Sequence, residues 1–216
     1  MTEPPPDCRL CERLAAFRDA NRAAYPDFFN APVPSFGPAD AALLIVGLAP
    51  GLKGANKTGR PFTGDYAGDL LYETLSEFGF ASGTYRADPD DGLELVDCRI
   101  TNAVRCVPPE NKPIGAEIKA CRTYLLGTLA QSVNLKAIVA LGRIAHDSVL
   151  SALGVRRAAH AFAHNARHDI GFPETGRTVA LFDSYHCSRY NTNTGRLTPE
   201  MFKAVFADVR DEIGRP

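Results

Sequence analysis

The sequence predicts an α/β fold: a single domain in which helices flank a central, mostly parallel four-stranded sheet. Four short apolar runs are separated by segments with helical periodicity, and strands that alternate with helices are typical of parallel sheets. The chain has 216 residues, of which 45% are hydrophobic, and this is enough for one sizeable core. No linker or internal repeat divides the chain, so we expect residues 1–216 to form one domain.

The expected elements follow from apolar spacing. Helices are predicted where apolar residues recur three or four positions apart, and strands where apolar, often β-branched residues run together. The prediction, in order, is a helix over residues 12–24, a strand over 43–46, a helix over 69–78, a strand over 93–104, a helix over 115–132, a strand over 136–141, a helix over 144–153, a strand over 179–182 and a helix over 199–213. Residues 1–7 contain three consecutive prolines and are expected to be a flexible lead-in, and residues 81–92 a polar loop.

A glycine-rich segment, residues 47–69, follows the first strand. Its other side chains include three bases, an aromatic ring and an acid, namely Lys53, Lys57, Arg60, Phe62 and Asp65. Glycines let a backbone approach a ligand closely, and ligands of open α/β sheets bind beyond the carboxyl ends of strands. The alternative is a plain surface loop with a few helix caps, but a loop this long is uncommon in a compact domain unless it is functional. We therefore expect the active site here.

Charge and composition narrow the class of protein. The formal net charge is -1, which argues against coating nucleic acid by bulk electrostatics but leaves room for one basic face that contacts DNA. No run approaches the roughly 18 apolar residues of a membrane span, and the proline-rich start lacks a secretory signal. We therefore expect a cytoplasmic protein without a membrane partner, in which paired cysteines indicate a metal site more than disulfides.

Two cysteine pairs have spacings that suit metal binding. Cys8 and Cys11 are separated by two residues, and Cys106 and Cys121 by fourteen. Four thiolates can bind zinc or an iron–sulfur cluster, and the spacing does not choose between the two. The alternative is that these are ordinary free cysteines.

Four motifs together resemble those of the uracil-DNA glycosylase superfamily, in particular its iron–sulfur type 5 branch. They are, in order, Gly-Leu-Ala-Pro-Gly at 47–51, Thr-Gly-Arg-Pro-Phe-Thr-Gly-Asp at 58–65, Arg-Cys-Val-Pro-Pro-Glu-Asn-Lys-Pro at 105–113 and His-Cys-Ser-Arg-Tyr-Asn-Thr-Asn-Thr-Gly at 186–195. The resemblance covers the chain from Cys8 to the final helix. It departs at Cys187, which stands where the family usually has a proline that stiffens the loop.

The resemblance implies a DNA repair enzyme. Such an enzyme flips uracil, or another deaminated or damaged base, out of DNA and hydrolyses the N-glycosidic bond, which leaves an abasic site. The resemblance also selects a 4Fe–4S cluster for Cys8, Cys11, Cys106 and Cys121. The expected partner is uracil-containing or otherwise damaged DNA, and we expect a monomer that acts on the nucleoid in a bacterial cytoplasm.

Three residues are implied to hold the base. Phe62 would stack on the flat pyrimidine, although it could also be a core residue. Asn102 offers an amide donor and a carbonyl acceptor that match O4 and N3–H of uracil, although a strand-end asparagine often caps a turn. His186 would donate to O2 of the departing base, and the alternative is a structural histidine.

The water-activating group is the open point. Other branches of the family carry Asp, Asn or Glu at the position of Ala49, which here borders the base but has no carboxylate. Asp65 is the nearest acid in the sequence, so it is expected to position or deprotonate the attacking water. The alternative is that Asp65 only caps the following helix.

The remaining candidate residues concern DNA contacts and histidines. We expect phosphate contacts or insertion into the duplex by Gly51, Lys53, Gly54, Lys57, Ser188, Arg189 and Tyr190. His164 lies in a segment that resembles one near the pocket of the family, and the resemblance implies that it helps to bind the base. His160, His164 and His168 are spaced by four and could be ligands on one helix face, but Asn165 and Gly171 weaken a helix and favour a loop.

Two rival functions are open at this stage. One is a superfamily member that traps uracil DNA covalently through a histidine near residues 156–164. The other is a non-catalytic iron–sulfur protein that binds nucleic acid. The missing carboxylate at Ala49 favours the second rival, and the concentration of pocket-type residues argues against it.

Overall fold

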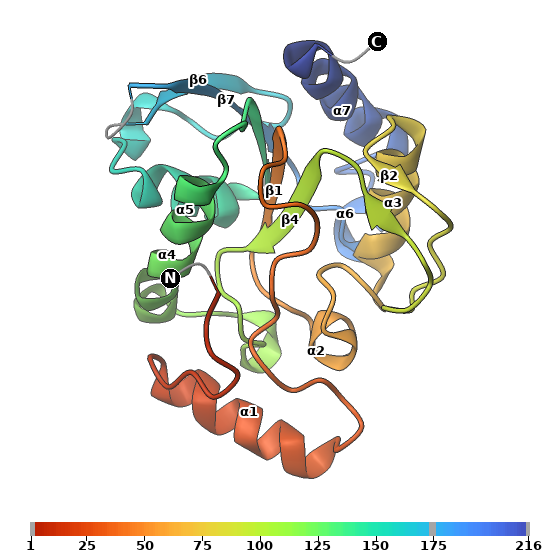
Figure 1. Ribbon diagram of the computed structural model, residues 1–216, viewed down its shortest axis with the longest axis vertical. Helices are drawn as coiled ribbons and strands as arrows, with labels where there is room; N and C mark the ends of the chain where they lie inside the picture. The colour runs from red at the N-terminus through yellow and green to blue at the C-terminus, as the bar shows by residue number, and fades with distance from the viewer. Residues whose placement is uncertain (1–2, 173–175, 215–216) are drawn as a thin grey trace.

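The computed structural model describes residues 3–172 and 176–214 (Figure 1). In chain order the elements are α1 (Glu12–Ala24), β1 (Leu43–Gly47), α2 (Ala55–Thr58), α3 (Tyr66–Glu77), β2 (Ala81–Ser82), β3 (Glu94–Leu95), β4 (Cys98–Asn102), α4 (Gly115–Gln131), β5 (Ala137–Leu141), α5 (Arg143–Ala152), β6 (Arg167–Gly171), β7 (Thr178–Ser184), α6 (Arg189–Asn193) and α7 (Pro199–Ile213), with 3-10 turns at Pro109–Asn111 and Arg157–Ala159. The predicted α/β architecture is confirmed. No helix in the described ranges is long and apolar enough to cross a membrane.

The central sheet has five strands in the order β4-β1-β5-β7-β6, so the prediction of four strands was wrong. The first four are parallel, and β6 pairs antiparallel with β7 at the edge. Only Ile170 of β6 is buried, so this strand lacks the apolar run by which the other four were recognised. The loop expected around His168 is therefore partly a strand. A separate two-stranded ribbon pairs β2 with β3, so the first two residues of the loop predicted over 81–92 are a strand.

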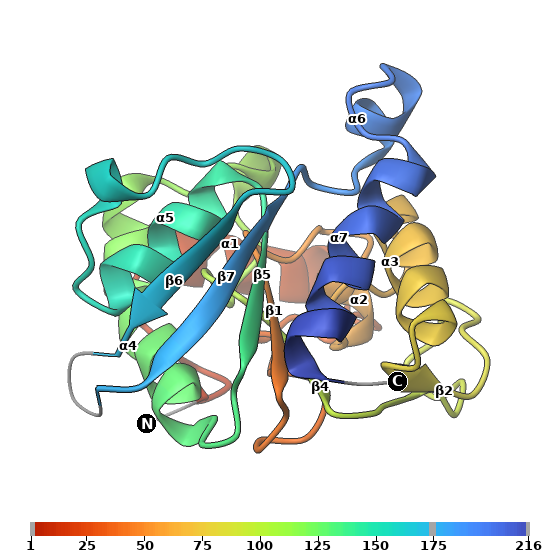
Figure 2. The same ribbon diagram turned by 90° about the horizontal axis from the view of Figure 1, so that it is seen from above.

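Helices cover both faces of the sheet. Figure 2 shows α4 and α5 on one face and α3 and α7 on the other. The side chains of β1 alternate between them: Leu43 and Ile45 pack in the core on the α3 and α7 side, and Leu44 and Val46 on the α4 and α5 side. Both faces of the sheet are buried at β1, which explains why this strand is an uninterrupted apolar run.

The last helix shows how local sequence sets an element's limits. Thr198 precedes α7, and its hydroxyl accepts a hydrogen bond from the N–H of Met201, while Pro199 occupies the first helical position, where a missing N–H costs nothing. Gly214 ends the helix with a positive φ of 76°, a conformation that glycine adopts without strain. These signals explain why the prediction of a helix over 199–213 is confirmed residue for residue.

The topology places the site. From β1, one connection leads to β4 on one side, and β5 lies on the other side, so the strand order reverses at β1. Ligands of such sheets bind in the crevice outside the carboxyl ends of the strands at this reversal. Gly47 at the end of β1 is in register with Asn102 at the end of β4, so the glycine-rich segment and Asn102 meet at this edge.

Candidate active site and cysteine site

A cavity of about 360 Å³ opens at the carboxyl ends of β1, β4 and β7. Four separate stretches of the chain form its walls. The lining residues are Leu48, Ala49, Pro50, Gly51, Ala55, Phe62, Asp65, Tyr66, Ala67, Asn102, Asn111, His186, Ser188 and Arg189. The structure thus brings together residues that the sequence had placed in one site although up to 140 positions separate them.

The floor of the cavity depends on Gly47. A Cβ atom at this position would collide with the Asn102 side-chain oxygen and would lie 2.8 Å from the tip of the Phe62 ring. The absence of a side chain therefore lets the amide of Asn102 and the ring of Phe62 approach each other across the end of β1. Asn102 is 3% exposed and ends a strand whose five residues are all buried, so its amide is held in place by the sheet.

Phe62 is held in a strained backbone conformation. Its φ is +53°, which is unusual for an aromatic residue, and such strain persists only where the surroundings fix it. Two tyrosines hold the backbone of this segment. The Tyr72 hydroxyl donates a hydrogen bond of 2.6 Å to the carbonyl of Pro61, and the Tyr85 hydroxyl donates one of 3.2 Å to the carbonyl of Phe62 itself. The ring lines the cavity and also belongs to the buried core on the α3 and α7 side, so it takes part in both.

A buried ion pair braces the same loop. Arg60 donates from both terminal nitrogens to Asp91, at 2.8 and 2.9 Å, and from Nε to Thr63 at 2.7 Å. Its guanidinium also lies 5.3–5.8 Å from three aromatic ring centres, those of Phe36, Tyr72 and Tyr85. Arg60 therefore serves the fold of the loop and not a phosphate contact.

His186 faces Phe62 across the cavity. The two ring centres are 5.8 Å apart with an angle of 28° between the planes. Burial lowers the pKa of His186 to about 4, so the imidazole is neutral at physiological pH. Asn191 fixes the backbone here by donating from its side-chain amide to the His186 carbonyl at 2.8 Å. A neutral imidazole still carries one N–H, which can donate to a ligand in the cavity.

Asp65 presents a carboxylate with spare capacity. It precedes α3, but its side chain makes no capping hydrogen bond to the helix. Its Oδ1 is buried and has no hydrogen-bond partner within residues 3–172 and 176–214. Burial raises the pKa of the carboxyl, and the nearby amides of Gly68 and Ala67 offset part of that rise. The carboxylate therefore has a lone pair available for a ligand or a water molecule.

The glycines near Asp65 make room for it. A Cβ atom at Gly54 would collide with Oδ2 of Asp65, and one at Gly51 would lie 3.4 Å from the same oxygen. Gly51 lines the cavity, whereas Gly54 is buried behind it. Two residues selected as DNA-contact candidates are thus placed around the carboxylate.

The other DNA-contact candidates are two lysines outside the cavity and three residues at the start of α6. Lys53 and Lys57 are exposed and do not line the cavity, and the Lys57 ammonium lies 5.7 Å from the centre of the Phe28 ring. Ser188 lines the cavity and caps α6 by accepting from the N–H of Asn191 at 3.5 Å. Arg189 lies over the Tyr66 ring at 5.1 Å, and Tyr190 is 72% exposed. Figure 2 shows α6 projecting from the body of the molecule.

The four candidate cysteines gather below this edge of the sheet. Cys8 and Cys11 precede α1, Cys106 follows β4 and Cys121 lies in α4, and all four line one small cavity. No three of their sulfur atoms lie within 4.8 Å of one another. Sulfurs around one zinc ion, with bonds of about 2.3 Å, would be closer than this. The arrangement is therefore wider than a single tetrahedral ion requires.

Hydrogen-bond donors surround these sulfurs. The N–H of Arg105 donates to Cys121 at 3.3 Å, and the guanidinium of Arg18 lies 3.9 Å from the sulfur of Cys106. Arg18 is 1% exposed, and its Nε and Nη2 have no partner in the described part of the chain. A buried cation without a carboxylate needs another anion, and a cluster held by four thiolates supplies negative charge at this place. The residues present thus fit an iron–sulfur cluster.

Comparison with known proteins agrees with this geometry. The family model described as the uracil DNA glycosylase superfamily matches residues 34–210. A type-5 uracil-DNA glycosylase of Thermus thermophilus is 43% identical over 212 residues, which cover 96% of this chain and 94% of the relative. The type-5 enzyme of Pyrobaculum aerophilum is 36% identical, with 96% and 90% covered, and a type-4 enzyme of Sulfurisphaera tokodaii is 32% identical, with 80% and 72% covered.

The chain belongs to the uracil-DNA glycosylase superfamily.

The structure places some of the predicted base-binding and catalytic residues in the cavity and one outside it. Ala49, Phe62, Asp65, Asn102 and His186 share the cavity. His164 does not line it. That ring stacks on Tyr185, with centres 5.1 Å apart, and its Nδ1 accepts from the Tyr185 N–H at 3.2 Å, so it supports the residue next to His186.

Sequence reasoning missed two polar residues that line the cavity, Tyr66 and Asn111, and the apolar Leu48, Pro50, Ala55 and Ala67. Asn111 ends a 3-10 turn and has a φ of +57°, and it lies five residues after Cys106. The signal was present, because Asn111 sits in the third of the motifs shared with the glycosylase superfamily. Tyr66 follows Asp65 directly and carried no signal of its own.

Proposed function

We propose that this protein is a DNA repair enzyme, a uracil-DNA glycosylase that flips uracil out of DNA and hydrolyses the N-glycosidic bond to leave an abasic site. The convergence of Phe62, Asn102, His186 and Asp65 in one cavity carries this proposal. The named type-5 relatives, similar over 96% of this chain, support it.

The base would be held between an aromatic face and an amide. Phe62 offers its ring to the cavity, and stacking on a flipped base contributes about 1–3 kcal/mol per base in other proteins. Asn102 pairs with the edge of uracil: its NH₂ donates to O4, and its carbonyl oxygen accepts from N3–H. The buried position of Asn102 keeps competing water away from these bonds.

The departing base would be stabilised by His186. When the glycosidic bond breaks, negative charge develops on uracil O2, and a neutral imidazole N–H can donate to it without giving up its proton. Its lowered pKa, about 4, keeps the imidazole in this form. One preorganised donor of this kind contributes roughly 2.7–4 kcal/mol to catalysis.

Asp65 would orient and deprotonate the water that attacks the sugar. The unpartnered Oδ1 can accept the water's proton, and its raised pKa makes the carboxylate a better base than a solvent-exposed one. The alternative role as a helix cap stays open: no hydrogen bond of the side chain meets the geometry of a cap, but the amides of Ala67 and Gly68 in the first turn of α3 face the carboxyl and lower its pKa. Ala49 leaves no other carboxylate for this task.

Cys8, Cys11, Cys106 and Cys121 would hold a 4Fe–4S cluster, with Arg18 as its buried counter-charge. When bound, the cluster would cross-link residues 8–11, the loop after β4 and α4 through its bonds to the four cysteines. Its role would be structural, because glycosidic hydrolysis requires no electron transfer. The loop after β4 carries Asn111 into the cavity, so the staple also fixes one wall of the active site.

The DNA would lie across the rim. Lys53 and Lys57 would contact phosphates on one side of the lesion. Ser188 and Arg189 would do so on the other side, and Tyr190 would fill the gap that the flipped base leaves. We further propose that the protein acts as a monomer in the bacterial cytoplasm, on the nucleoid, without a membrane partner.

The deciding experiment is an alkali-cleavage assay on an end-labelled oligonucleotide with one uracil. We expect cleavage at the uracil and none in the matched oligonucleotide with thymine. DNA binding without abasic sites would overturn the proposal in favour of a binding protein. An adduct that survives heating in denaturant would instead indicate covalent trapping, although residues 156–164 do not line the cavity.

The cluster is tested separately by iron and sulfide content. We expect a yellow-brown protein whose iron is lost in Cys11→Ser but kept in Cys98→Ser, since Cys98 lies in β4 and outside the cysteine cavity. A colourless protein with one zinc held by these cysteines would contradict the cluster.

A further inference from the structure

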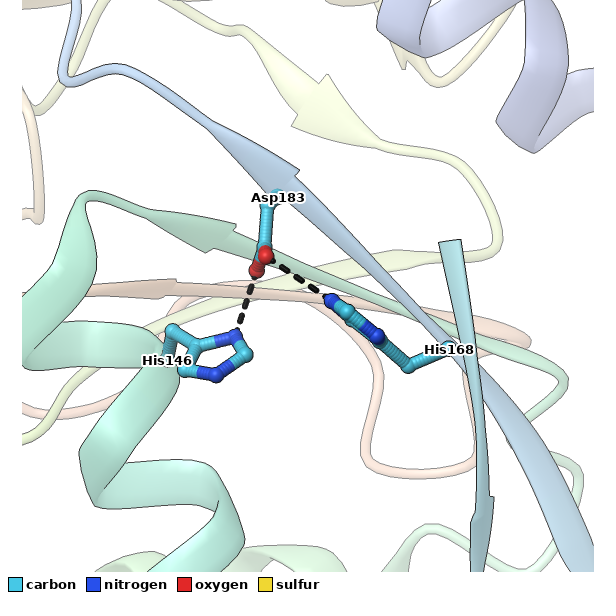
Figure 3. Close-up of side chains that lie close together, drawn as sticks. All are labelled: His146, His168 and Asp183. Atoms are coloured by element: carbon cyan, nitrogen blue, oxygen red, sulfur yellow. Dashed lines mark hydrogen bonds and ion pairs between the residues drawn. The ribbon is translucent and has the colours of Figure 1, made fainter. Parts of the chain in front are cut away.

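A second group of chemically capable side chains lies between α5, β6 and β7. His146, His168 and Asp183 offer three ligand atoms that all lie within 4.8 Å of one another. No other such group of histidine, cysteine or acidic residues occurs in the described ranges. Figure 3 shows both rings directed at the Asp183 carboxylate. None of the three lines the active-site cavity.

The hydrogen bonds fix where His146 carries its proton. Its Nε2 lies 2.9 Å from the carbonyl oxygen of His160, which can only accept, so Nε2 is protonated. Its Nδ1 lies 2.7 Å from Oδ1 of Asp183. In a neutral imidazole this nitrogen is an acceptor, and an ionised carboxylate is an acceptor as well. Two acceptors need a positive particle between them, and at 2.7 Å this particle is a proton; a zinc ion that took its place, with bonds of about 2.0–2.2 Å, would hold the two atoms roughly 3.3–3.6 Å apart.

We propose that His146, His168 and Asp183 bind one zinc ion. Imidazole nitrogen and carboxylate oxygen are zinc ligands, with bonds of about 2.0–2.2 Å. The second bond of His146 supports this, because a ligating histidine almost always donates its other N–H to a carboxylate, a carbonyl or water. His168 completes the set from the opposite side, with its Nε2 3.0 Å from Oδ2 of Asp183.

The setting suits a metal site. His146 and Asp183 are fully buried, whereas the side chain of His168 is 13% exposed and offers an entry path. Three of the chain's five histidines, including His160, gather here. The His160 ring does not belong to the group within 4.8 Å, so the three residues would leave a fourth position open to water. On binding, zinc would displace the proton between His146 Nδ1 and Oδ1, which is released to solvent, and the proton on His168 Nε2 would move to Nδ1 of the same ring, so that both ligating nitrogens carry a free lone pair.

The ion would stabilise the wall behind the active site. Asp183 already anchors the loop before β6: its carboxylate lies 3.4 Å from the N–H of Ala163, and its carbonyl accepts from Asn165 at 2.8 Å. Asp183 also lies three residues before His186 on the same stretch of chain. Zinc would therefore tie α5, β6 and β7 together beside the segment that positions His186.

The test measures zinc on the full-length protein. The wild type, His168→Gln and His164→Gln are each incubated with zinc chloride, passed through a desalting column and analysed for zinc and iron, and Tm is recorded with and without zinc. We expect one zinc per chain in the wild type and in His164→Gln, and a rise of Tm with zinc in both. We expect His168→Gln to lose both effects, and because His168 lies partly exposed on an edge strand this variant should fold.

A Cys11→Ser variant excludes the cysteine site as the source of the zinc. It should still bind one zinc that the double variant with His168→Gln does not bind. Equal zinc in the wild type and His168→Gln, or zinc that disappears only with Cys11→Ser, would overturn the proposal. So would a wild type that retains no zinc, because a proton would then join His146 to Asp183.

Discussion

Two aspartates beside the same loop differ in how completely their carboxylates are bonded. Asp91 receives four hydrogen bonds, two from Arg60 and one each from the N–H groups of Leu93 and Arg86. Asp65 has a buried oxygen without a partner among the described residues. The Arg60 guanidinium holds the pKa of Asp91 well below its usual range, whereas burial raises that of Asp65. The environment has moved two identical groups in opposite directions.

The difference separates structural from chemical roles. A fully bonded carboxylate is locked as an anion and cannot take a proton from a ligand, but it stabilises the loop around it. A buried carboxylate with a free lone pair destabilises the fold, and such groups cluster at functional sites. The same contrast separates Arg60, which is fully engaged, from Arg18, which has two nitrogens without a partner among the described residues and a third, Nη1, 3.9 Å from the Cys106 sulfur.

Breaking the structural aspartate should have the largest effect. Asp91→Ala leaves the Arg60 charge buried and unpaired, so we expect a loss of about 3–5 kcal/mol in the free energy of unfolding, measured by urea denaturation. Because the folded pKa of Asp91 is lowered, its contribution is present above the unfolded pKa of about 3.9 and is lost as the pH falls below it. Asp90→Ala, an exposed neighbour, should change stability by less than about 0.5 kcal/mol.

An Asp91→Ala protein as stable as the wild type would show that the aromatic rings alone hold Arg60. The comparison with Asp65 would then lose its structural half.

His186 should carry the largest catalytic effect. His186→Ala removes a donor that acts mainly in the transition state, so kcat should fall about 100- to 1,000-fold with little change in DNA affinity. Because its pKa is about 4, the histidine stays neutral at pH 5–8 and should add no inflection near pH 6.5. Single-turnover kinetics measure this, with His160→Ala as the control outside the cavity. A loss in DNA affinity alone would assign His186 to binding.

Asp65→Asn tests the chemical half of the comparison. If Asp65 is the base, the rate should fall on the order of a hundredfold and the acid limb of the pH profile should flatten. The free energy of unfolding, in contrast, should rise in Asp65→Asn. A raised folded pKa means that the wild type loses stability as the pH rises through that pKa, and asparagine removes this loss. Near-normal kinetics with an unchanged pH profile would leave Asp65 without a role as base.

The sequence predicted the parts of the molecule that depend on local patterns. The apolar run of β1 and the capping signals of α7 specify their own structure, and the resemblance to the glycosylase motifs assigned Phe62 and His186 to one site. It failed where distant contacts decide. The edge strand β6 has only Ile170 buried, so its pairing with β7 leaves little trace in the sequence.

The bonding of side chains was beyond prediction for the same reason. Nothing local tells that Asp91 is satisfied by Arg60, 31 positions away, or that His146 meets Asp183, 37 positions away. From the sequence we considered only whether His160 and His168 share one helix face, and we preferred a loop without ligands. In the structure these two residues lie near His146, which belongs to a different element, α5.

The smallest expected effect concerns which base is chosen. Asn102→Asp keeps the size and the buried position of the side chain but replaces the amide donor that faces O4 of uracil with an acceptor. Cytosine carries an N4 amine at this place, and a carboxylate accepts from it. A good paired contact discriminates by about 1–3 kcal/mol. The ratio of kcat/KM for uracil over kcat/KM for cytosine should therefore fall by about 5- to 150-fold. Competition assays on matched oligonucleotides measure the ratio directly.

A matched control, Asn111→Asp, alters the other amide in the cavity, which the proposal does not pair with the base edge, and it should leave the ratio unchanged. Equal loss on both bases in Asn102→Asp would mean that Asn102 holds the ends of β1 and β4 together instead of recognising the base, which would place it with Asp91 on the structural side.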